Sequence, residues 1–401
     1  MRFSELPAMV CLALAWGVYG LMSTPADAAK GPVKVFILAG QSNMQGKAAA
    51  STLEPVIADP TTAEDFRHLK KDGEWTVRDD VWVTFLCKTV KAPADDLPLY
   101  GPLTVGFGSQ KTARDENNER ISVPGIGPEL GFGHVVGEHF EEQVLLIKTA
   151  WGGKSVRVNF RPPSATPSDE ELRLELERRK KKNPDVTLEE VRESYGAFYR
   201  EMLAQVREPL ENMGKYFPEY DAGQGFEIAG MVWFQGWNDG VGRGNPQYTE
   251  QLAHLIRDVR RDLGVPNMPV VIGELGVDGD EPMGWIATFR KQQAAVAEMP
   301  EFKDNVRFAR TAQCWPSWQG SLDGKWGEFK AKEKAWREQL KAEGKTPTRE
   351  EVQAFGDEHW REPNQATLAR MSDKRYHYMG CGETQYRMGE AFGAAMLEMV
   401  R

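Results

Sequence analysis

A serine that directly follows an apolar, β-prone run is the first residue that could do chemistry. The run, Val35 to Ala39, predicts a fully buried strand, which stops at Gly40 and leads into Gln41, Ser42 and Asn43. The carboxyl edge of a rigid sheet is where α/β enzymes hold a nucleophile, so the Ser42 hydroxyl is a candidate for that role. Serine also caps helices frequently, and on this segment alone both interpretations stay open.

Two more strand ends carry groups that could stabilise developing negative charge. A Gly-Gly pair that begins at Gly152 follows the apolar segment 144–147, and such a pair can turn a backbone N–H toward a ligand. Asn238 follows the segment 231–234 and can donate a side-chain N–H without carrying charge. For the glycines, an ordinary turn is an equal alternative. We expect Asp239 to cap the turn that follows it.

The histidine best placed to act as a base is His377, just before the last predicted helix. It lies in a predicted loop near Asp373, and a carboxylate there could hold the tautomer of the imidazole while the ring reaches a serine. The other five of the six histidines lie in helix-like or charged settings: His68, His134, His139, His254 and His359. A lone histidine is more often structural, but a serine early and a histidine late, each at the end of an element, favour nucleophilic catalysis.

The order of these segments resembles the SGNH (GDSL-like) hydrolase superfamily. The matching blocks are Gly40-Gln-Ser-Asn-Met44, Gly152, Gly236-Trp-Asn-Asp239 and the late Asp…His pair. The GQSNM form, together with Trp-Phe-Gln-Gly-x-x-Asp at residues 233–239, is similar to the sialate O-acetylesterase-like branch of carbohydrate esterases. The resemblance covers most of residues 29–401 outside two helical insertions.

This resemblance implies a serine esterase that removes O-acetyl groups from carbohydrate through an acyl-enzyme. It implies Ser42 as nucleophile and His377 as general base, with an oxyanion hole formed by the N–H groups of Ser42 and Gly152 and the side chain of Asn238. Acyl transfer needs no metal or cofactor, and no cluster of His, Asp and Glu has the spacing of metal ligands. We therefore expect neither.

Two departures from the family pattern leave the third member of the triad open. The usual carboxylate stands three residues before the histidine, where this chain has Lys374, and Asp373 stands four before. Some members carry a glutamate after Gln-Gly, where this chain has Trp237. Asp373 is our first choice and Glu274, at another strand end, is the alternative. A G-x-S-x-G elbow is also missing, which argues against an α/β-hydrolase.

Aromatic and polar residues near the strand ends suggest a sugar substrate. Flat aromatic faces suit sugar rings, and five tryptophans fall at or near strand ends: Trp151, Trp233, Trp237, Trp285 and Trp315. Trp233 lies inside a strand run and is expected in the core. The residues we expect to contact substrate are Gln41, Asn43, Trp151, Lys154, Gln235 and Trp237. Lys154 and Arg157 could pair with an acidic group on a glycan or could equally be solvated.

Strand and helix patterns alternate along the chain, which predicts an α/β/α three-layer sandwich with a parallel sheet, of the SGNH or flavodoxin-like kind. Besides the first strand, the predicted strands are 81–85, 144–149, 228–234, 270–275 and 306–311. Helices are predicted from about residue 129, over 249–263 and over 383–400.

Two charged helical insertions interrupt this alternation, at about 164–215 and 322–362. Capping boxes begin at Ser168, Thr187 and Thr348, and the last two open with the same Thr-x-Glu-Glu-Val signature. We expect two helical hairpins packed near each other at one edge of the sheet. The basic run 178–182 is interpreted as a solvated helix face rather than as a site for an anionic polymer.

Residues 1–28 are interpreted as a secretory signal peptide, because an apolar run from Ala8 to Met22 precedes the small-residue segment Ala26-Asp-Ala28. We expect a secreted or periplasmic protein without a membrane anchor after cleavage. The formal net charge of −9 gives no support to nucleic-acid binding. Cys87, Cys314 and Cys381 follow the signal, and one bridge between the last two is possible but not required. The sequence predicts no oligomeric state.

The sequence is also compatible with two other functions. A carbohydrate-binding protein that kept the fold without turnover would fit the missing carboxylate at position 374. A glycosidase would need two acidic residues such as Glu274 and Asp278, whose context resembles a turn.

Overall fold

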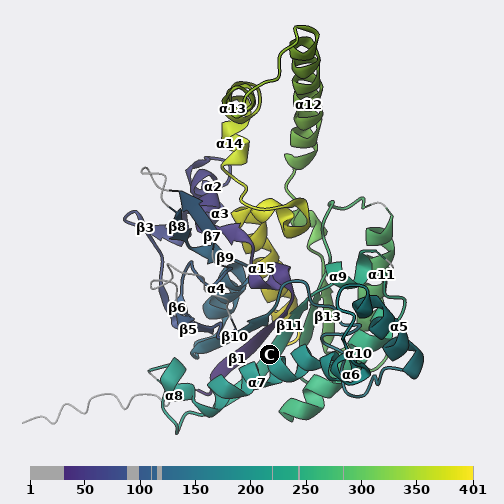
Figure 1. Cartoon of the computed structure of the whole chain (residues 1–401). Helices are drawn as coiled ribbons and strands as arrows, with labels where there is room; N and C mark the ends of the chain where they lie inside the picture. The colour runs from purple at the N-terminus through teal and green to yellow at the C-terminus, as the bar shows by residue number, and fades with distance from the viewer. Residues whose placement is uncertain are drawn as a thin grey trace, which may run out of the picture. The chain divides into compact units, whose positions relative to one another are not determined.

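The apolar run that begins at Val33 forms β1 (Val33–Gly40), the central strand of a seven-stranded sheet in the computed structural model (Figure 1). Its neighbours, β10 (Val144–Ala150) and β11 (Phe226–Phe234), run parallel to it. The sheet order is β13-β12-β11-β1-β10-β5-β6, with β5 (Arg78–Thr84), β6 (Tyr100–Leu103), β12 (Val270–Gly273) and β13 (Val306–Ala309). All six predicted strands form. The sequence pattern misses β6, a short edge strand that runs antiparallel to β5.

The structure describes residues 31–87, 99–109, 111–114, 120–218, 220–242, 244–282 and 284–400. The expected signal peptide lies outside these ranges. Within them, no helix is both long and apolar enough to cross a lipid bilayer.

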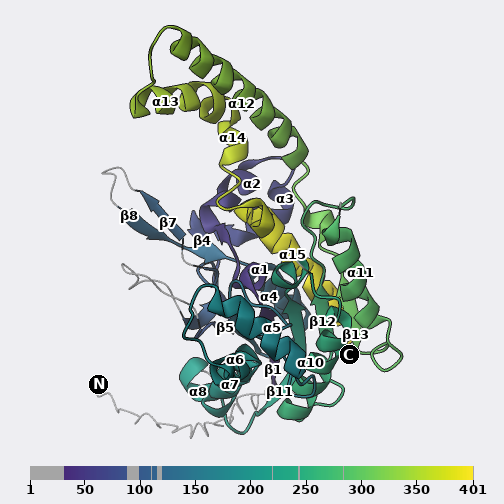
Figure 2. The ribbon, with the colours of Figure 1, turned by 45° about the vertical axis from the view of Figure 1, so that its right-hand side comes forward.

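Helices cover both faces of the sheet, so the α/β/α three-layer prediction is confirmed. On one face lie α4 (Glu129–His139) and α15 (Gly382–Leu397), and on the other α7 (Ala197–Glu211), α10 (Tyr248–Leu263) and α11 (Trp285–Ala297) (Figures 1 and 2). The sequence pattern predicts α4, α10 and α15 but misses α11. The buried face of α11 includes Arg290 and Gln293, which interrupt its apolar periodicity.

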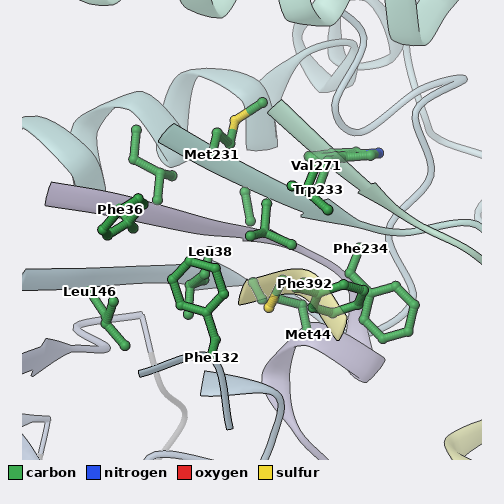
Figure 3. Close-up of a cluster of buried hydrophobic side chains, with 14 of the residues drawn as sticks. Phe36, Leu38, Met44, Phe132, Leu146, Met231, Trp233, Phe234, Val271 and Phe392 are labelled. Carbon is green, nitrogen blue, oxygen red and sulfur yellow. The ribbon is translucent and has the colours of Figure 1, made fainter. Parts of the chain in front are cut away.

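The core lies on both sides of the sheet because side chains alternate along each strand. In β11, Trp233 points to one side, where its ring centre lies 5.1 Å from that of Phe160. Phe234 points to the other side, where its ring centre lies 5.1 Å from that of Phe392 in α15 (Figure 3). Trp233 is fully buried, which confirms its prediction as a core residue.

Short helices and strands connect the main elements. The helices among them are α1 (Ser42–Gln45), α2 (Glu54–Ala58), α3 (Ala63–Phe66), α8 (Met213–Tyr216), α9 (Trp237–Gly240) and α14 (Gln365–Leu368). The small strands are β2 (Ala48–Ala49), β3 (Lys70–Lys71), β4 (Glu74–Trp75), β7 (Lys111–Arg114), β8 (Arg120–Val123) and β9 (Gly125–Ile126), and β7 pairs with β8 in an antiparallel hairpin outside the main sheet.

The two insertions differ from the expected pair of neighbouring hairpins. In the first, α5 (Asp169–Lys180) and α6 (Leu188–Ser194) form a small hairpin, but α7 packs on β10 as a sheet helix. In the second, α12 (Gln319–Ala342) and α13 (Arg349–Gly356) lie at the opposite end of the described chain from α5 and α6 (Figures 1 and 2).

The prediction that the hairpins pack together is therefore wrong. All three predicted capping boxes form, at Ser168, Thr187 and Thr348. A capping box fixes only where a helix begins, whereas apolar contacts decide where the helix lies. The second hairpin packs its aromatic residues on one another, with Trp336 stacked 4.5 Å from Phe355.

The structure also bears on the basic run 178–182 and on the cysteines. In the basic run, Arg178 and Arg179 pair with Glu175 of the same helix, as expected of a solvated helix face. Cys87, Cys314 and Cys381 are all free, so the possible bridge between the last two is not formed.

Candidate active site

Three parallel strands end at the same level and bring their following loops together. In the sheet register, Gly40 of β1 lies beside Ala150 of β10 and Phe234 of β11. The Trp151 N–H donates to the Gly40 carbonyl at 3.1 Å, and the Gln41 N–H donates to the Phe234 carbonyl at 3.2 Å. The loops that carry Ser42, Gly152 and Asn238 therefore leave one edge of the sheet side by side.

Gly40 is required for the turn into Ser42. Its φ is 152°, and a β-carbon at this position would lie 2.1 Å from the Phe234 carbonyl oxygen. Ser42 then opens the one-turn helix α1 and is almost fully buried. Gly152 lies close to it, since a β-carbon on Gly152 would be 3.6 Å from Ser42 Cβ. N–H groups in the first turn of a helix have no partner within the helix, so the Ser42 N–H can donate to a ligand.

Gln41 is a buried connector between the serine loop and the Asn238 loop. Its Oε1 accepts from the Gly236 N–H at 3.1 Å and from the Asn238 N–H at 3.4 Å. Its Nε2 donates to Asn238 Oδ1 at 3.4 Å and lies 3.5 Å from Ser42 Oγ. Through these contacts Gln41 supports the site, and its contact with substrate stays a prediction.

Asn238 presents its side-chain amide beside the Gly-Gly turn. Its Nδ2 donates to the Gly153 carbonyl at 3.1 Å, and its Oδ1 is held by Gln41. An amide nitrogen carries two hydrogens, so a second N–H is left to donate. Asn238 is half-buried, which keeps that donor accessible.

The His377 loop reaches the serine loop from the far end of the chain. Asn43 donates from Nδ2 to the Tyr376 carbonyl at 3.3 Å, which joins the residue after Ser42 to the residue before His377. The loop has an unusual backbone, because Tyr378 and Met379 both have positive φ angles, of 52° and 59°. The structure therefore brings the Ser42 and His377 segments together across more than 330 positions.

Of the two carboxylates considered for the triad, Asp373 is the one bonded to His377. Its Oδ1 lies 2.9 Å from His377 Nδ1, and its Oδ2 forms an ion pair with Lys111. Burial alone would raise the pKa of Asp373, but hydrogen bonds from His377 and Lys111 outweigh it and hold the pKa well below its usual range. Asp373 is thus an anion at neutral pH. Glu274 instead accepts from the Ala312 N–H at 2.9 Å.

Asp239 does more than cap a turn, which is the role we expected for it. Its buried carboxylate accepts from the N–H groups of Val156 at 2.7 Å and Arg157 at 3.0 Å, and also from the side chains of Gln235 and Asn245. Burial raises its pKa, against the effect of these donors. Asp239 therefore holds the loop after Gly152 against α9. The sequence carries one hint, the i, i+4 spacing of Gln235 and Asp239.

The family model of carbohydrate esterases described as sialic acid-specific acetylesterases matches residues 32–309. The chain belongs to this family. It is therefore a carboxylic ester hydrolase, as the resemblance implies. The matched segment includes Ser42, Gly152 and Asn238 but ends before Asp373 and His377.

Several solved structures are similar to this esterase. A protein from Arabidopsis thaliana is 17% identical, with 70% of this chain and 86% of that chain covered and a TM-score of 0.38. A carbohydrate acetylesterase from Xanthomonas citri is 13% identical, over 69% of this chain and 49% of its own, with a TM-score of 0.38. NanS is 14% identical, over 71% and 78%, with a TM-score of 0.40. Among curated proteins no match is found.

The remaining residues expected to contact substrate divide into buried and open ones. Asn43 and Gln235 are buried and bond to protein atoms, as Gln41 does. Trp151 is half-buried, with its ring centre 5.2 Å from that of Phe198, and the Lys154 ammonium lies 4.1 Å from the centre of the same Phe198 ring. These two stay available at the edge of the site.

Trp237 belongs to an aromatic group that the sequence shows only in part. Its ring centre lies 5.1 Å from that of Trp285 and 5.5 Å from that of Tyr376, and Tyr376 lies 4.4 Å from the His377 ring. We call Trp237, Trp285 and Tyr376 the aromatic ledge. Tyr376 is 40% exposed, so the ledge opens to solvent beside the histidine. Sequence reasoning misses Tyr376 and Lys111 because neither lies in a strand-end motif.

Proposed function

We propose that this esterase removes O-acetyl groups from carbohydrate, with Ser42 as nucleophile, His377 as general base and Asp373 as the carboxylate that orients the imidazole. The observation that carries the proposal is the junction of the two loops. The Asn43 side chain donates a hydrogen bond to the Tyr376 carbonyl, which joins the serine loop to the histidine loop. The Asp373 carboxylate is hydrogen-bonded to His377 Nδ1, so Nε2 is the ring nitrogen that is left to act on Ser42.

In the first half of the proposed reaction, His377 Nε2 takes the proton of Ser42 Oγ as that oxygen attacks the ester carbonyl carbon. The carbonyl oxygen becomes an oxyanion, which the N–H groups of Ser42 and Gly152 and the free N–H of Asn238 stabilise. The bond to the sugar oxygen then breaks, and His377 returns the proton to that oxygen. The sugar leaves, and an acetyl group stays on Ser42.

The second half repeats the sequence with water. His377 takes a proton from water as the water oxygen attacks the acetyl carbon, and the same donors stabilise the second oxyanion. The bond between the acetyl carbon and Ser42 Oγ breaks as His377 returns its proton to that oxygen, so that acetic acid leaves, ionises to acetate in water, and the enzyme is restored.

The aromatic ledge supports a sugar as the alcohol part of the ester. The apolar face of a sugar ring packs well on exposed aromatic rings, and this ledge lies directly beside His377. Lys154, two residues after Gly152, is available to an acidic group on the glycan. Export to the periplasm or outside the cell is part of the proposal and is supported by the signal-like pattern of residues 1–28.

The test measures acetate released from a panel of acetylated oligosaccharides that includes both neutral and sialylated ones. Wild-type protein and S51A, a control at an exposed serine, should release acetate, and S42A should release at least 10³-fold less, by the order of magnitude expected for loss of a triad nucleophile. Equal release by S42A would exclude Ser42 as the nucleophile. Tight glycan binding without any release would instead favour a carbohydrate-binding protein.

A further inference from the structure

The second oxygen of Asp373 has a partner from a distant part of the chain. Oδ1 accepts from the Lys374 N–H at 2.7 Å in addition to its contact with His377 Nδ1. Oδ2 forms an ion pair with Nζ of Lys111, the first residue of β7, 262 positions earlier. The carboxylate is thus held from both sides, with one oxygen for the histidine and the other for the lysine.

This ion pair differs from an ordinary surface pair because both partners are largely withdrawn from water. The Lys111 side chain is 14% exposed and that of Asp373 is 20% exposed, close to the 14% of His377. Exposed ion pairs contribute little, because water screens them and long side chains lose freedom in forming them. A partly buried pair fixes the orientation of its two side chains more firmly, because neither charged group is well hydrated when the pair breaks.

The charges near the pair indicate that Lys111 has Asp373 as its counterion. Lys47 lies close by and donates to Ser109 Oγ at 2.8 Å, and burial together with the charge of Lys111 lowers the pKa of Lys47 to about 8. Lys148, the next lysine inward, is paired with Glu129 at 2.5 Å. Among the residues that the structure describes, Asp373 is the carboxylate that forms an ion pair with Lys111.

We propose that Lys111 is a positioning residue for the esterase reaction. It holds Oδ2 of Asp373 so that Oδ1 stays on His377 Nδ1, which keeps the proton of the neutral imidazole on Nδ1 and the lone pair of Nε2 toward Ser42. An aspartate carboxylate rotates readily about its last bond. Without Lys111, other orientations compete, and the imidazole loses its fixed tautomer and direction. The inference rests on the proposed function of His377.

The first test is a double-mutant cycle on a chromogenic acetate ester. K111M should lower kcat by about 10- to 100-fold, the range for losing a hydrogen bond to a charged group, with KM nearly unchanged. K111R should retain most of the activity because it keeps the charge. In a D373N background, K111M should change kcat by less than about twofold, because Lys111 acts through the carboxylate. An equal loss in both backgrounds, or wild-type kcat in K111M, would overturn the proposal.

The matched control is K34M. Lys34 forms an ion pair with Glu227 at 2.8 Å and is 16% exposed, but it lies at the opposite end of β1 from Ser42. K34M should leave kcat unchanged. If K111M proves too unstable to assay, K111Q takes its place, with urea denaturation used to show that the assayed variant is folded.

A second readout does not need turnover. The Nδ1–H proton of His377, bonded to an anionic carboxylate, should give a far-downfield proton NMR signal that is absent in H377Q. The signal should persist in K34M and K111R and should weaken or vanish by exchange in K111M. An unchanged signal in K111M would contradict the role of Lys111 whatever the substrate is. Loss of the signal in K111M from a protein that hydrolyses no ester would support that role while the proposed function failed.

Discussion

Asn238 carries two amide hydrogens, and the fold uses one of them. That hydrogen bonds to the Gly153 carbonyl, while Gln41 holds the amide oxygen. The orientation of the amide is therefore set before substrate arrives, and the proposed reaction needs no reorganisation of this donor. A donor fixed in advance is what makes oxyanion stabilisation large.

Replacing Asn238 with alanine should lower kcat by about 10²- to 10³-fold and leave KM nearly unchanged, because the lost N–H acts on the transition state. N238D is the matched variant, since it keeps an oxygen for Gln41 but has no N–H to donate, and it should lose as much. Steady-state kinetics on an acetate ester checks both. Wild-type turnover in either variant would remove Asn238 from the oxyanion hole.

The positions of single residues in the site could be predicted where polar residues directly follow a predicted strand. Ser42 follows a strand that the pattern predicts, and His377 stands out by its order in the chain. The sequence does not show that the amides of Gln41 and Gln235 are buried against other protein groups, and their contact with substrate stays a prediction. Lys111 could not be found at all, since its contact with Asp373 spans 262 positions and follows no local period.

At the scale of elements, Asp239 joins the loop after β10 to the helix after β11. Its two oxygens accept four hydrogen bonds, two from backbone N–H groups and two from side-chain amides. The same loop begins at Gly152. The position of Gly152, one of the proposed oxyanion donors, therefore depends on a carboxylate that has no part in the proposed reaction.

D239N should lower the free energy of unfolding by about 2–3 kcal/mol, because the new amide NH₂ faces groups that also donate. It should lower kcat as well, since the loop that carries Gly152 loses its anchor. Urea denaturation and kinetics measure the two effects. D304N, at an exposed aspartate, should change stability by less than about 0.5 kcal/mol. A D239N protein as stable and active as wild type would contradict this account.

The elements themselves were predictable to different degrees. Strands 144–149, 228–234 and 270–275 form because their apolar runs are buried on both faces of a parallel sheet, whereas strands 81–85 and 306–311, nearer the sheet edges, are partly exposed. Helix α11 escaped prediction because its buried face includes Arg290 and Gln293, whose partners come from distant strand ends. The positions of the two hairpins also depend on tertiary contacts, which a capping signature does not encode.

At the scale of the whole molecule, the buried His134, which packs against the more exposed His68, affects stability in acid. His134 in α4 packs against His68 with ring centres 5.0 Å apart, and His68 bonds to the hydroxyl of Tyr386 in α15 at 2.9 Å. Burial lowers the pKa of His134 to about 3 and also lowers the pKa of His68. Both rings are therefore neutral in the folded protein at neutral pH, away from the candidate triad.

The low pKa of His134 makes the free energy of unfolding depend on pH. Below about pH 6.5 the unfolded chain binds a proton at His134, whereas the folded chain binds that proton only near pH 3. The free energy of unfolding therefore falls as pH falls through this window. The loss from His134 should be about 2 kcal/mol between pH 6.5 and 4.5.

Urea denaturation at the two pH values, on wild type and H134F, measures this loss. H134F should show a smaller loss in acid, and H139F, at an exposed histidine of the same helix, should behave as wild type. The same acid sensitivity in H134F and wild type would show that other groups cause it.

The central claim, that Ser42 is a nucleophile activated by His377, is tested most directly by labelling with a fluorophosphonate and mapping the modified peptide by mass spectrometry. The account predicts one modified residue, Ser42, with no label in S42A and labelling slowed by at least about 10³-fold in H377A. A label on a different residue, or equal labelling of wild type and S42A, would contradict it.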